Sequence, residues 1–130
     1  MRIIVTGGCG FIGSNLVRLL LHRGHQVMNI DKLTYAGNMA SVRAIEGSTS
    51  YRFQQADICD SGSMEEAMAS FRPNAVMHLA AESHVDRSID GPMDFVQTNV
   101  VGTVTLLQAA LSYWLSLDKS KSEKFRFLHG

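Results

Sequence analysis

The sequence predicts an α/β fold in which a doubly wound parallel sheet of about five strands is covered by helices on both faces. Two observations lead to this prediction. Short apolar runs rich in β-branched residues alternate with longer stretches of helical periodicity, and a glycine-rich turn joins the first run to the first helical stretch. Parallel strands need crossover connections, and helices in that role bury the strands on both faces.

The first two predicted elements are a strand at residues 3–5 and the helix that follows it. The strand is a run of β-branched residues, as expected for burial on both faces. Gly24 stands where a residue of left-handed conformation would end the helix. The apolar residues that place this helix by their spacing are Ile12, Leu16, Val17, Leu20 and Leu21.

The second and third strands are predicted at residues 27–30 and 51–53, where β-branched and aromatic residues cluster. Asp31 stands at the carboxyl end of the second strand. The pattern between the two strands is weak and indicates only a short helix at residues 40–45.

The next helix and strand are marked by a capping pattern and a proline. Ser63 and Glu66 have the spacing of a capping box, so we expect the helix to begin at Ser63 and to end before Pro73. An apolar fourth strand follows at residues 75–79. His78 lies within it and is interpreted as a core histidine with satisfied hydrogen bonds rather than a ligand.

The last third of the chain predicts a long helix at residues 92–117, a polar loop at 119–124 and a fifth strand at 125–129. We expect one apolar stripe of the helix to be its buried face. That stripe consists of Val100, Val104, Leu107, Leu111 and Trp114 or Leu115.

Composition excludes several classes of protein. Twelve Lys and Arg balance twelve Asp and Glu, so a binder of nucleic acid or of an anionic membrane is not favoured. Two cysteines are too few for a disulfide scaffold, and no metal site has plausible ligand spacing. No apolar run approaches the roughly 20 residues that span a bilayer. We expect a cytoplasmic, reduced protein with a single domain over residues 1–130.

The turn after the first strand has the spacing of a phosphate-binding loop. Gly7, Gly10 and Gly13 stand between the predicted strand and helix. Such glycines allow a tight turn, a close approach of a pyrophosphate to the backbone, and close packing of helix on strand. Phe11 and Ile12 would supply amides of the first helical turn, where the helix dipole favours an anion.

Asp31 supplies the second part of a dinucleotide-binding pattern. A carboxylate at the end of the second strand accepts hydrogen bonds from the adenosine ribose and repels a 2′-phosphate. This favours NAD over NADP, although the neighbouring Lys32 acts in the opposite direction. The alternative interpretation is a glycine turn whose backbone is capped by the carboxylate, without a cofactor.

Four segments carry a more specific resemblance. They are TGGCGFIG at residues 6–13, DKLTYAGN at 31–38, ADICD at 56–60 and LAAESHVDRS at 79–88. With them the chain resembles the extended short-chain dehydrogenase/reductases, and within these the dTDP-glucose 4,6-dehydratases. The resemblance implies a Rossmann-type sheet and a cofactor, NAD, that is tightly bound and not consumed.

The implied reaction converts dTDP-glucose to dTDP-4-keto-6-deoxyglucose and water. The sugar is oxidised at C4, dehydrated across C5 and C6, and reduced at C6, which makes the enzyme a lyase. Ser83 is implied to touch the sugar substrate as well as the cofactor. The residues that the resemblance assigns to the cofactor are Gly7, Gly10, Phe11, Ile12, Gly13, Asp31, Lys32, Leu33, Thr34, Asp57, Ile58, Leu79, Ala80, Ala81, Ser83 and Thr98.

The family's catalytic segments are not found within these residues. A Thr-Asp-Glu segment should follow the fifth strand, and a Tyr-x-x-x-Lys pair should come later still. Residues 1–130 contain neither. We therefore expect the amino-terminal portion of such an enzyme, incomplete relative to the family, with no catalytic residue, no substrate domain and no activity alone.

The sequence leaves two alternatives open, and the family implies one partner. A nucleotide-sugar 4-epimerase of the same superfamily would share the glycine turn and Asp31. A non-catalytic NAD-binding module is the second alternative. The resemblance also implies that the full-length protein forms a homodimer.

Overall fold

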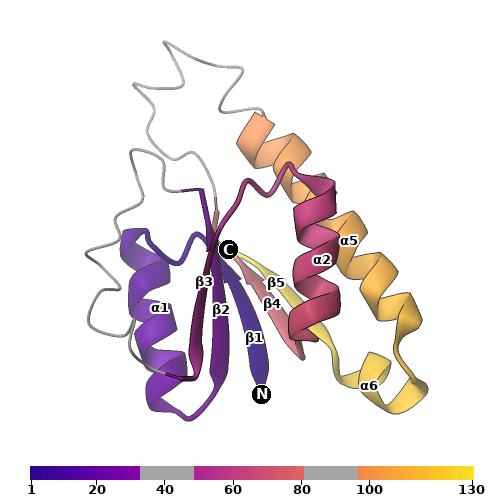
Figure 1. The fold of residues 1–130 in the computed structure, drawn as a ribbon, viewed down its shortest axis with the longest axis horizontal. Coiled ribbons are helices and arrows are strands. Elements are labelled where there is room, and N and C mark those ends of the chain that lie inside the picture. The colour runs from indigo at the N-terminus through magenta and orange to yellow at the C-terminus, as the bar shows by residue number, and fades with distance from the viewer. Residues whose placement is uncertain (33–48, 81–96) are drawn as a thin grey trace.

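The computed structural model describes residues 1–32, 49–80 and 97–130. Five strands form one parallel sheet in the order β3-β2-β1-β4-β5 (Figure 1). The strands are β1 (Arg2–Thr6), β2 (Gln26–Asp31), β3 (Tyr51–Gln55), β4 (Ala75–His78) and β5 (Arg126–His129). The five-stranded parallel sheet predicted from the sequence is therefore confirmed.

Helices cover both faces of this sheet (Figure 1). The helix α1 (Phe11–His22) lies against one face. On the other face, α2 (Ser61–Phe71) and α5 (Thr103–Ser116) pack against each other and against the strands. A π-helical segment η3 (Gln97–Gly102) leads into α5, and α6 (Lys119–Lys124) connects α5 to β5.

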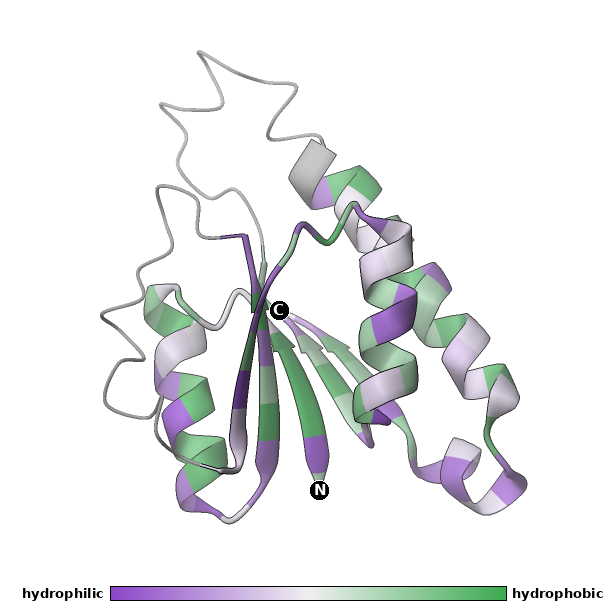
Figure 2. Ribbon diagram, in the orientation of Figure 1, coloured by the Kyte–Doolittle hydropathy of each residue, from purple (hydrophilic) through white to green (hydrophobic). Residues whose placement is uncertain are grey.

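The side chains of the central strands divide into two cores by strict alternation. Ile3 and Val5 of β1 point into the cluster under α1, whereas Ile4 points into the cluster under α2 and α5. All three are at most 2% exposed. This alternation follows from the two-residue repeat of a strand, and it explains why the middle of the sheet is apolar (Figure 2).

The end of α1 matches the prediction made for Gly24. The residue has φ +86°, and its amide donates to the Leu21 carbonyl at 3.0 Å. The next amide, that of His25, reaches back to the Leu20 carbonyl at 3.1 Å. These two bonds form a Schellman motif, which glycine favours because it has no Cβ to clash in the left-handed region.

The predicted capping box at the start of α2 is wrong. The helix begins at Ser61, and Asp60 is its N-cap. The Asp60 carboxylate accepts hydrogen bonds from the Ser63 amide at 3.2 Å and from the Ser63 hydroxyl at 2.9 Å. Ser63 therefore lies within the first turn of the helix and donates to the N-cap residue Asp60, instead of being the N-cap itself. The helix ends before Pro73, as predicted.

The predicted buried stripe of the last long helix is also wrong. Val104, Leu107 and Leu111 are 49%, 43% and 55% exposed. The buried side chains of α5 are Leu106, Ala109, Ala110 and Tyr113. Both sets have helical spacing, and the set with two alanines faces inward because α2 packs close against it. Residues 92–96 of the predicted helix lie outside the described residues.

Residues 119–124, predicted as a polar loop, form the helix α6. Asp118 is its N-cap and accepts from the Lys121 amide at 3.0 Å. The helix has no buried residue, so it shows no apolar periodicity from which it could have been predicted. The short helix expected at residues 40–45 lies outside the described residues. No helix in the described part of the chain is long and apolar enough to cross a membrane.

Candidate nucleotide-binding site

The glycine-rich turn lies at the carboxyl edge of the sheet, between β1 and α1. There β1 is flanked by β2 on one side and by β4 on the other, so the direction of the strand order reverses. Ligands of open α/β sheets bind in the crevice that such a reversal creates. The fold therefore places the turn where a nucleotide site is expected.

Two glycines shape the turn. Gly7 has φ +75°, and a Cβ on it would lie 2.8 Å from the Ala80 amide nitrogen. A Cβ on Gly13 would overlap the Gly7 carbonyl, which lets α1 pack directly on the turn. The turn itself is closed by the Gly10 amide, which donates to the Gly7 carbonyl at 3.1 Å. Side chains at these positions would fill the space that the backbone needs.

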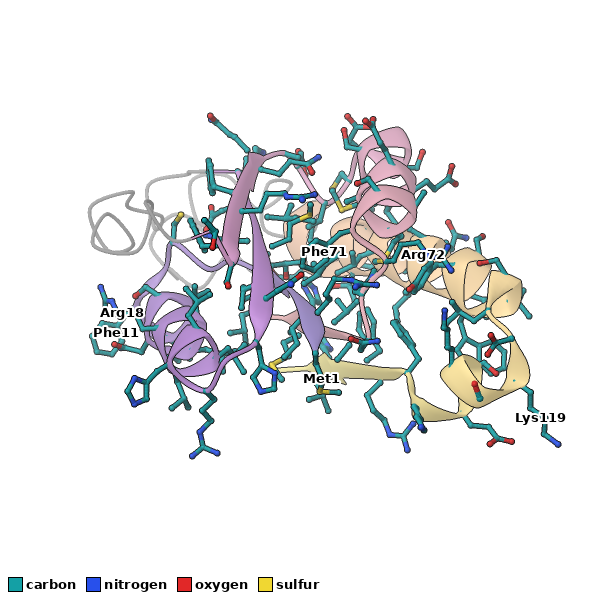
Figure 3. The ribbon with its side chains drawn as sticks, turned by 60° about the horizontal axis from the view of Figure 1, so that its bottom comes forward. Met1, Phe11, Arg18, Phe71, Arg72 and Lys119 are labelled. Atoms are coloured by element: carbon teal, nitrogen blue, oxygen red, sulfur yellow. The ribbon has the colours of Figure 1, made fainter. Side chains whose placement is uncertain are left out.

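The first turn of α1 is open to an anion. Its first helical hydrogen bond runs from the Ser14 amide to the Gly10 carbonyl at 2.9 Å, so the three amides before Ser14 have no helical partner. Phe11 and Ile12 are 84% and 69% exposed, and Phe11 points away from the sheet (Figure 3). No acidic residue stands in this turn to compete with a bound anion.

Asp31 is held against the glycine turn. Its side chain is 8% exposed, and Oδ2 accepts a 2.9 Å hydrogen bond from the Cys9 amide. The carboxylate therefore stands beside the backbone of the glycine-rich turn. A glycine turn capped by this carboxylate, without a cofactor, was the alternative interpretation of the sequence. The same contact also fixes the carboxylate at the carboxyl edge of the sheet.

Asn29 is a site residue that the sequence analysis missed. It is fully buried two residues before Asp31, on the same side of β2, and its Oδ1 accepts from the Gly8 amide at 2.9 Å. Its amide group donates to the Tyr51 hydroxyl at 3.1 Å. A polar residue inside an otherwise apolar strand was the available signal, since a buried amide must find partners.

Hydrogen bonds of the Thr6 side chain, which the sequence analysis did not predict, join β1 to β4. The Thr6 hydroxyl accepts from the amides of Leu79 and Ala80, both at 3.1 Å. With both lone pairs engaged it donates to Nδ1 of His78 at 2.6 Å, and Nε2 of His78 then donates to the Thr103 hydroxyl at 2.8 Å. Burial, together with the stacked His129 ring 4.9 Å away, lowers the pKa of His78 to about 4. The core-histidine interpretation is confirmed.

Lys32 and Asp57 meet across the ends of β2 and β3. The ammonium lies 3.3 Å from Oδ2 of the carboxylate. Burial opposes ionisation of Asp57, but the Cys59 amide at 2.9 Å and the Lys32 charge outweigh it, so the pKa of Asp57 lies below its usual value. Next to this pair Ile58 is 4% exposed and belongs to the core beneath α5.

The structure brings together one part of the predicted site. The glycine turn, Asp31 and the Leu79–Ala80 backbone adjoin one another at the carboxyl edge. Thr98 lies in η3, and nothing is described of its side chain. Four predicted site residues lie outside the described residues, namely Leu33, Thr34, Ala81 and Ser83. In the described residues no group of three or more His, Cys, Asp or Glu could hold a metal ion.

Comparison with known proteins gives consistent matches. The family model described as GDP-mannose 4,6 dehydratase matches residues 4–130. A probable dTDP-glucose 4,6-dehydratase of Sinorhizobium fredii is 57% identical over 129 residues, which are 99% of this chain and 37% of that protein. The dTDP-glucose 4,6-dehydratase of Haemophilus influenzae is 55% identical over 130 residues, 99% of this chain and 38% of its own length.

Solved structures of similar proteins agree with these sequence matches. A dTDP-glucose 4,6-dehydratase from Streptomyces venezuelae, crystallised with NAD, has a TM-score of 0.81 at 45% identity and covers 87% of this chain and 36% of its own. A UDP-glucose 4-epimerase from Thermotoga maritima, crystallised with UDP-glucose, has a TM-score of 0.79 at 34% identity, covering 87% and 35%. The chain thus spans little more than a third of the length of these relatives.

Proposed function

The chain belongs to the GDP-mannose 4,6-dehydratase family, and from this membership we propose that residues 1–130 form the NAD-binding unit of a dTDP-glucose 4,6-dehydratase. The observation that carries the proposal is the Asp31 carboxylate bonded to the turn that opens α1. An anion-binding helix start and a ribose-binding acid then stand side by side, as a dinucleotide requires.

The preference for NAD over NADP is part of this proposal. Asp31 would accept from the ribose hydroxyls and repel a 2′-phosphate. Lys32, which could have attracted that phosphate, is paired with Asp57 at 3.3 Å. The ion pair places a negative charge beside the ammonium, which weakens its attraction for a 2′-phosphate.

We assign binding roles, and no catalytic role, to residues of this chain. Bound NAD would supply the hydride acceptor for oxidation of the sugar at C4 and would return the hydride to C6 after water is lost. The amides of Phe11 and Ile12 would hold the pyrophosphate, and the Thr6 hydroxyl would fix the backbone at Leu79 and Ala80 beneath the nicotinamide half. The cofactor and substrate contacts of Leu33, Thr34, Ala81, Ser83 and Thr98 are proposed from the family resemblance.

A second copy of the protein is proposed as the partner of α5. The outward stripe of this helix is apolar, and α5 carries no acidic or basic residue in its terminal turns. Val104, Leu107 and Leu111 are each more than 40% exposed. Two such helices can bury their stripes against each other in an isologous interface, in which the same surface serves both copies.

The rival activity is 4-epimerisation of a nucleotide sugar. It is favoured by the epimerase match at a TM-score of 0.79. Epimerisation would use the same turn and the same Asp31, because both reactions begin with oxidation of the sugar at C4. The described residues therefore support NAD binding for either reaction.

The decisive experiment uses the protein as its gene encodes it. Incubated with dTDP-glucose, a dehydratase yields a product lighter by one water, which mass spectrometry detects. An epimerase acting on UDP-glucose yields a product of unchanged mass, which chromatography separates. Turnover of neither sugar, combined with tight NAD binding, would instead favour the non-catalytic module.

A further inference from the structure

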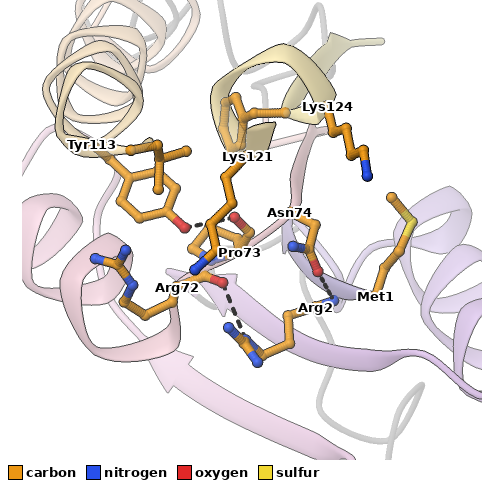
Figure 4. A pocket seen from close by; sticks show the side chains of 10 residues that line it. Met1, Arg2, Arg72, Pro73, Asn74, Tyr113, Lys121 and Lys124 are labelled. Carbon is orange, nitrogen blue, oxygen red and sulfur yellow. Dashed lines mark hydrogen bonds between the residues drawn. The ribbon is translucent and has the colours of Figure 1, made fainter. Parts of the chain in front are cut away.

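A pocket of about 260 Å³ lies at the amino edge of the sheet (Figure 4). The start of β1, the connection from α2 to β4, the end of α5 and the helix α6 meet around it. The glycine-rich turn lies at the other end of β1. Because β1 has five residues, the two places are separated by about 15 Å at the rise of a β-strand.

The walls of this pocket concentrate positive charge. Arg2, Arg72, Lys121 and Lys124 line it, and no Asp or Glu is among its lining residues. Within the described part of the chain, none of these four side chains forms an ion pair with a carboxylate. The chain as a whole has a formal net charge of zero, so this concentration is local. Charges of one sign that line a cleft attract the opposite charge.

Two of the basic groups are held in position by neighbouring contacts. Nε of Arg2 donates to the carbonyls of Phe71 at 2.8 Å and Arg72 at 3.1 Å, which leaves its Nη groups for another acceptor. The Arg72 guanidinium lies over the Tyr113 ring, 5.3 Å from its centroid. The Tyr113 hydroxyl is itself fixed to the Pro73 carbonyl at 2.8 Å.

The backbone of Arg72 makes this placement unusual. Its φ of 55° is the only positive value among the non-glycine residues described. A left-handed backbone is unfavourable for a residue with a long side chain. Arg72 ends α2 in this conformation while its side chain lies against Tyr113 at the pocket. The contact with Tyr113 therefore holds the guanidinium of this exposed residue at the rim of the pocket.

We propose that this pocket binds the phosphate group of a small molecule. Guanidinium groups match the oxygens of a phosphate in pairs, and a lysine ammonium adds a mobile point charge. Arg2 and Arg72 would form the fixed part of the site, and Lys121 and Lys124 on the exposed face of α6 would close on the ligand. The local contacts of Arg2 and Arg72 orient their side chains but leave their charges uncompensated.

The test titrates inorganic phosphate, and a hexose 1-phosphate in a second arm, into the protein as its gene encodes it. Sodium chloride keeps the ionic strength equal in every sample, because exposed charges are screened by salt. The variants are Lys121→Gln and Lys124→Gln. The control is Lys119→Gln, since Lys119 belongs to the same helix but points away from the body of the molecule (Figure 3). Circular dichroism verifies that all variants fold.

We expect saturable binding that Lys121→Gln weakens at least about tenfold, the loss of a charge-assisted hydrogen bond, with Lys119→Gln unchanged. Tighter binding of the hexose phosphate would identify an esterified ligand, and equal binding a free phosphate. The affinity for NAD should be the same in all variants. Absence of saturable binding, or equal binding by the Lys121 and Lys119 variants, would overturn the proposal.

Discussion

The backbone amide of Cys9 donates a 2.9 Å hydrogen bond to Oδ2 of Asp31. The acid that we propose to bind the ribose therefore also supports the glycine-rich turn. The bond joins the carboxyl end of β2 to the loop after β1. A change at Asp31 therefore affects both the charge of the crevice and the shape of the turn. Two substitutions can separate these effects.

Asp31→Asn should lower the preference for NAD over NADP at least about tenfold, because the charge that repels a 2′-phosphate is lost while an oxygen for the Cys9 amide remains. Asp31→Ala should also lower the free energy of unfolding by about 1–3 kcal/mol, since a buried amide loses its acceptor. Calorimetric titration with both cofactors and urea denaturation measure the two effects. An unchanged preference in Asp31→Asn would contradict the ribose-binding role.

Gly13→Ala should abolish NAD binding and lower the free energy of unfolding by about 1–3 kcal/mol, because the new Cβ would overlap the Gly7 carbonyl. Gly62→Ala on α2 is the matched control. A Cβ there lies 3.6 Å from the nearest oxygen, so this helical position should be stabilised by about 0.5–1 kcal/mol. Full NAD affinity in the Gly13 variant would show that the turn is not the binding site.

His78 should make stability fall between pH 7 and pH 5. Its pKa is about 4 in the folded chain and 6.5 in the unfolded chain, so the unfolded state binds the additional proton in this range. Stability is thus fully present above the unfolded pKa and declines by about 2 kcal/mol down to pH 5. Lowered carboxyl pKa values, as at Asp57, act mainly below this range because the unfolded value is 3.8.

The variant His78→Gln should remove most of this pH dependence, as measured by urea denaturation at several pH values. His22→Gln is the control, because His22 is exposed in the last turn of α1. The same slope in His78→Gln and in the unsubstituted protein would show that His78 is not the group responsible.

Leu111→Lys should convert a dimer to a monomer, because it places a charge in the middle of the apolar stripe of α5. Leu111 is 55% exposed, so the fold of each copy should be unaffected. Ser112→Lys is the control, as it adds the same charge at an exposed polar position about 100° around the same helix from Leu111. Sedimentation velocity measures the state of each variant. A Leu111→Lys protein that remains dimeric would place the interface elsewhere.

The strand and helix order could be predicted because local signals mark it. Gly24 ends α1 with a positive φ, and Pro73 keeps α2 from continuing. The glycine turn and Asp31 could be located from local signals too, because the turn directly precedes α1 and Asp31 is the last residue of β2. Their meeting at one crevice follows from the parallel pairing of β1 with β2.

The errors concern features that depend on packing between elements. The apolar residues of α5 surround the helix, so only contact with α2 decides that Ala109 and Ala110 face inward. Asp60 and Ser63 are both good N-cap residues, and their spacing alone does not rank them. The bond between Thr6 and His78 joins residues 72 positions apart, which no local pattern contains.

Trp114 gives the protein an internal optical probe. It is the only tryptophan in the sequence, and its indole Nε1 donates to the Ser122 carbonyl of α6 at 2.8 Å. The emission of this single fluorophore therefore depends on whether α6 stays docked against α5. Displacement of that helix can be followed in the unlabelled protein, with the spectrum shifting to longer wavelengths as water replaces the carbonyl.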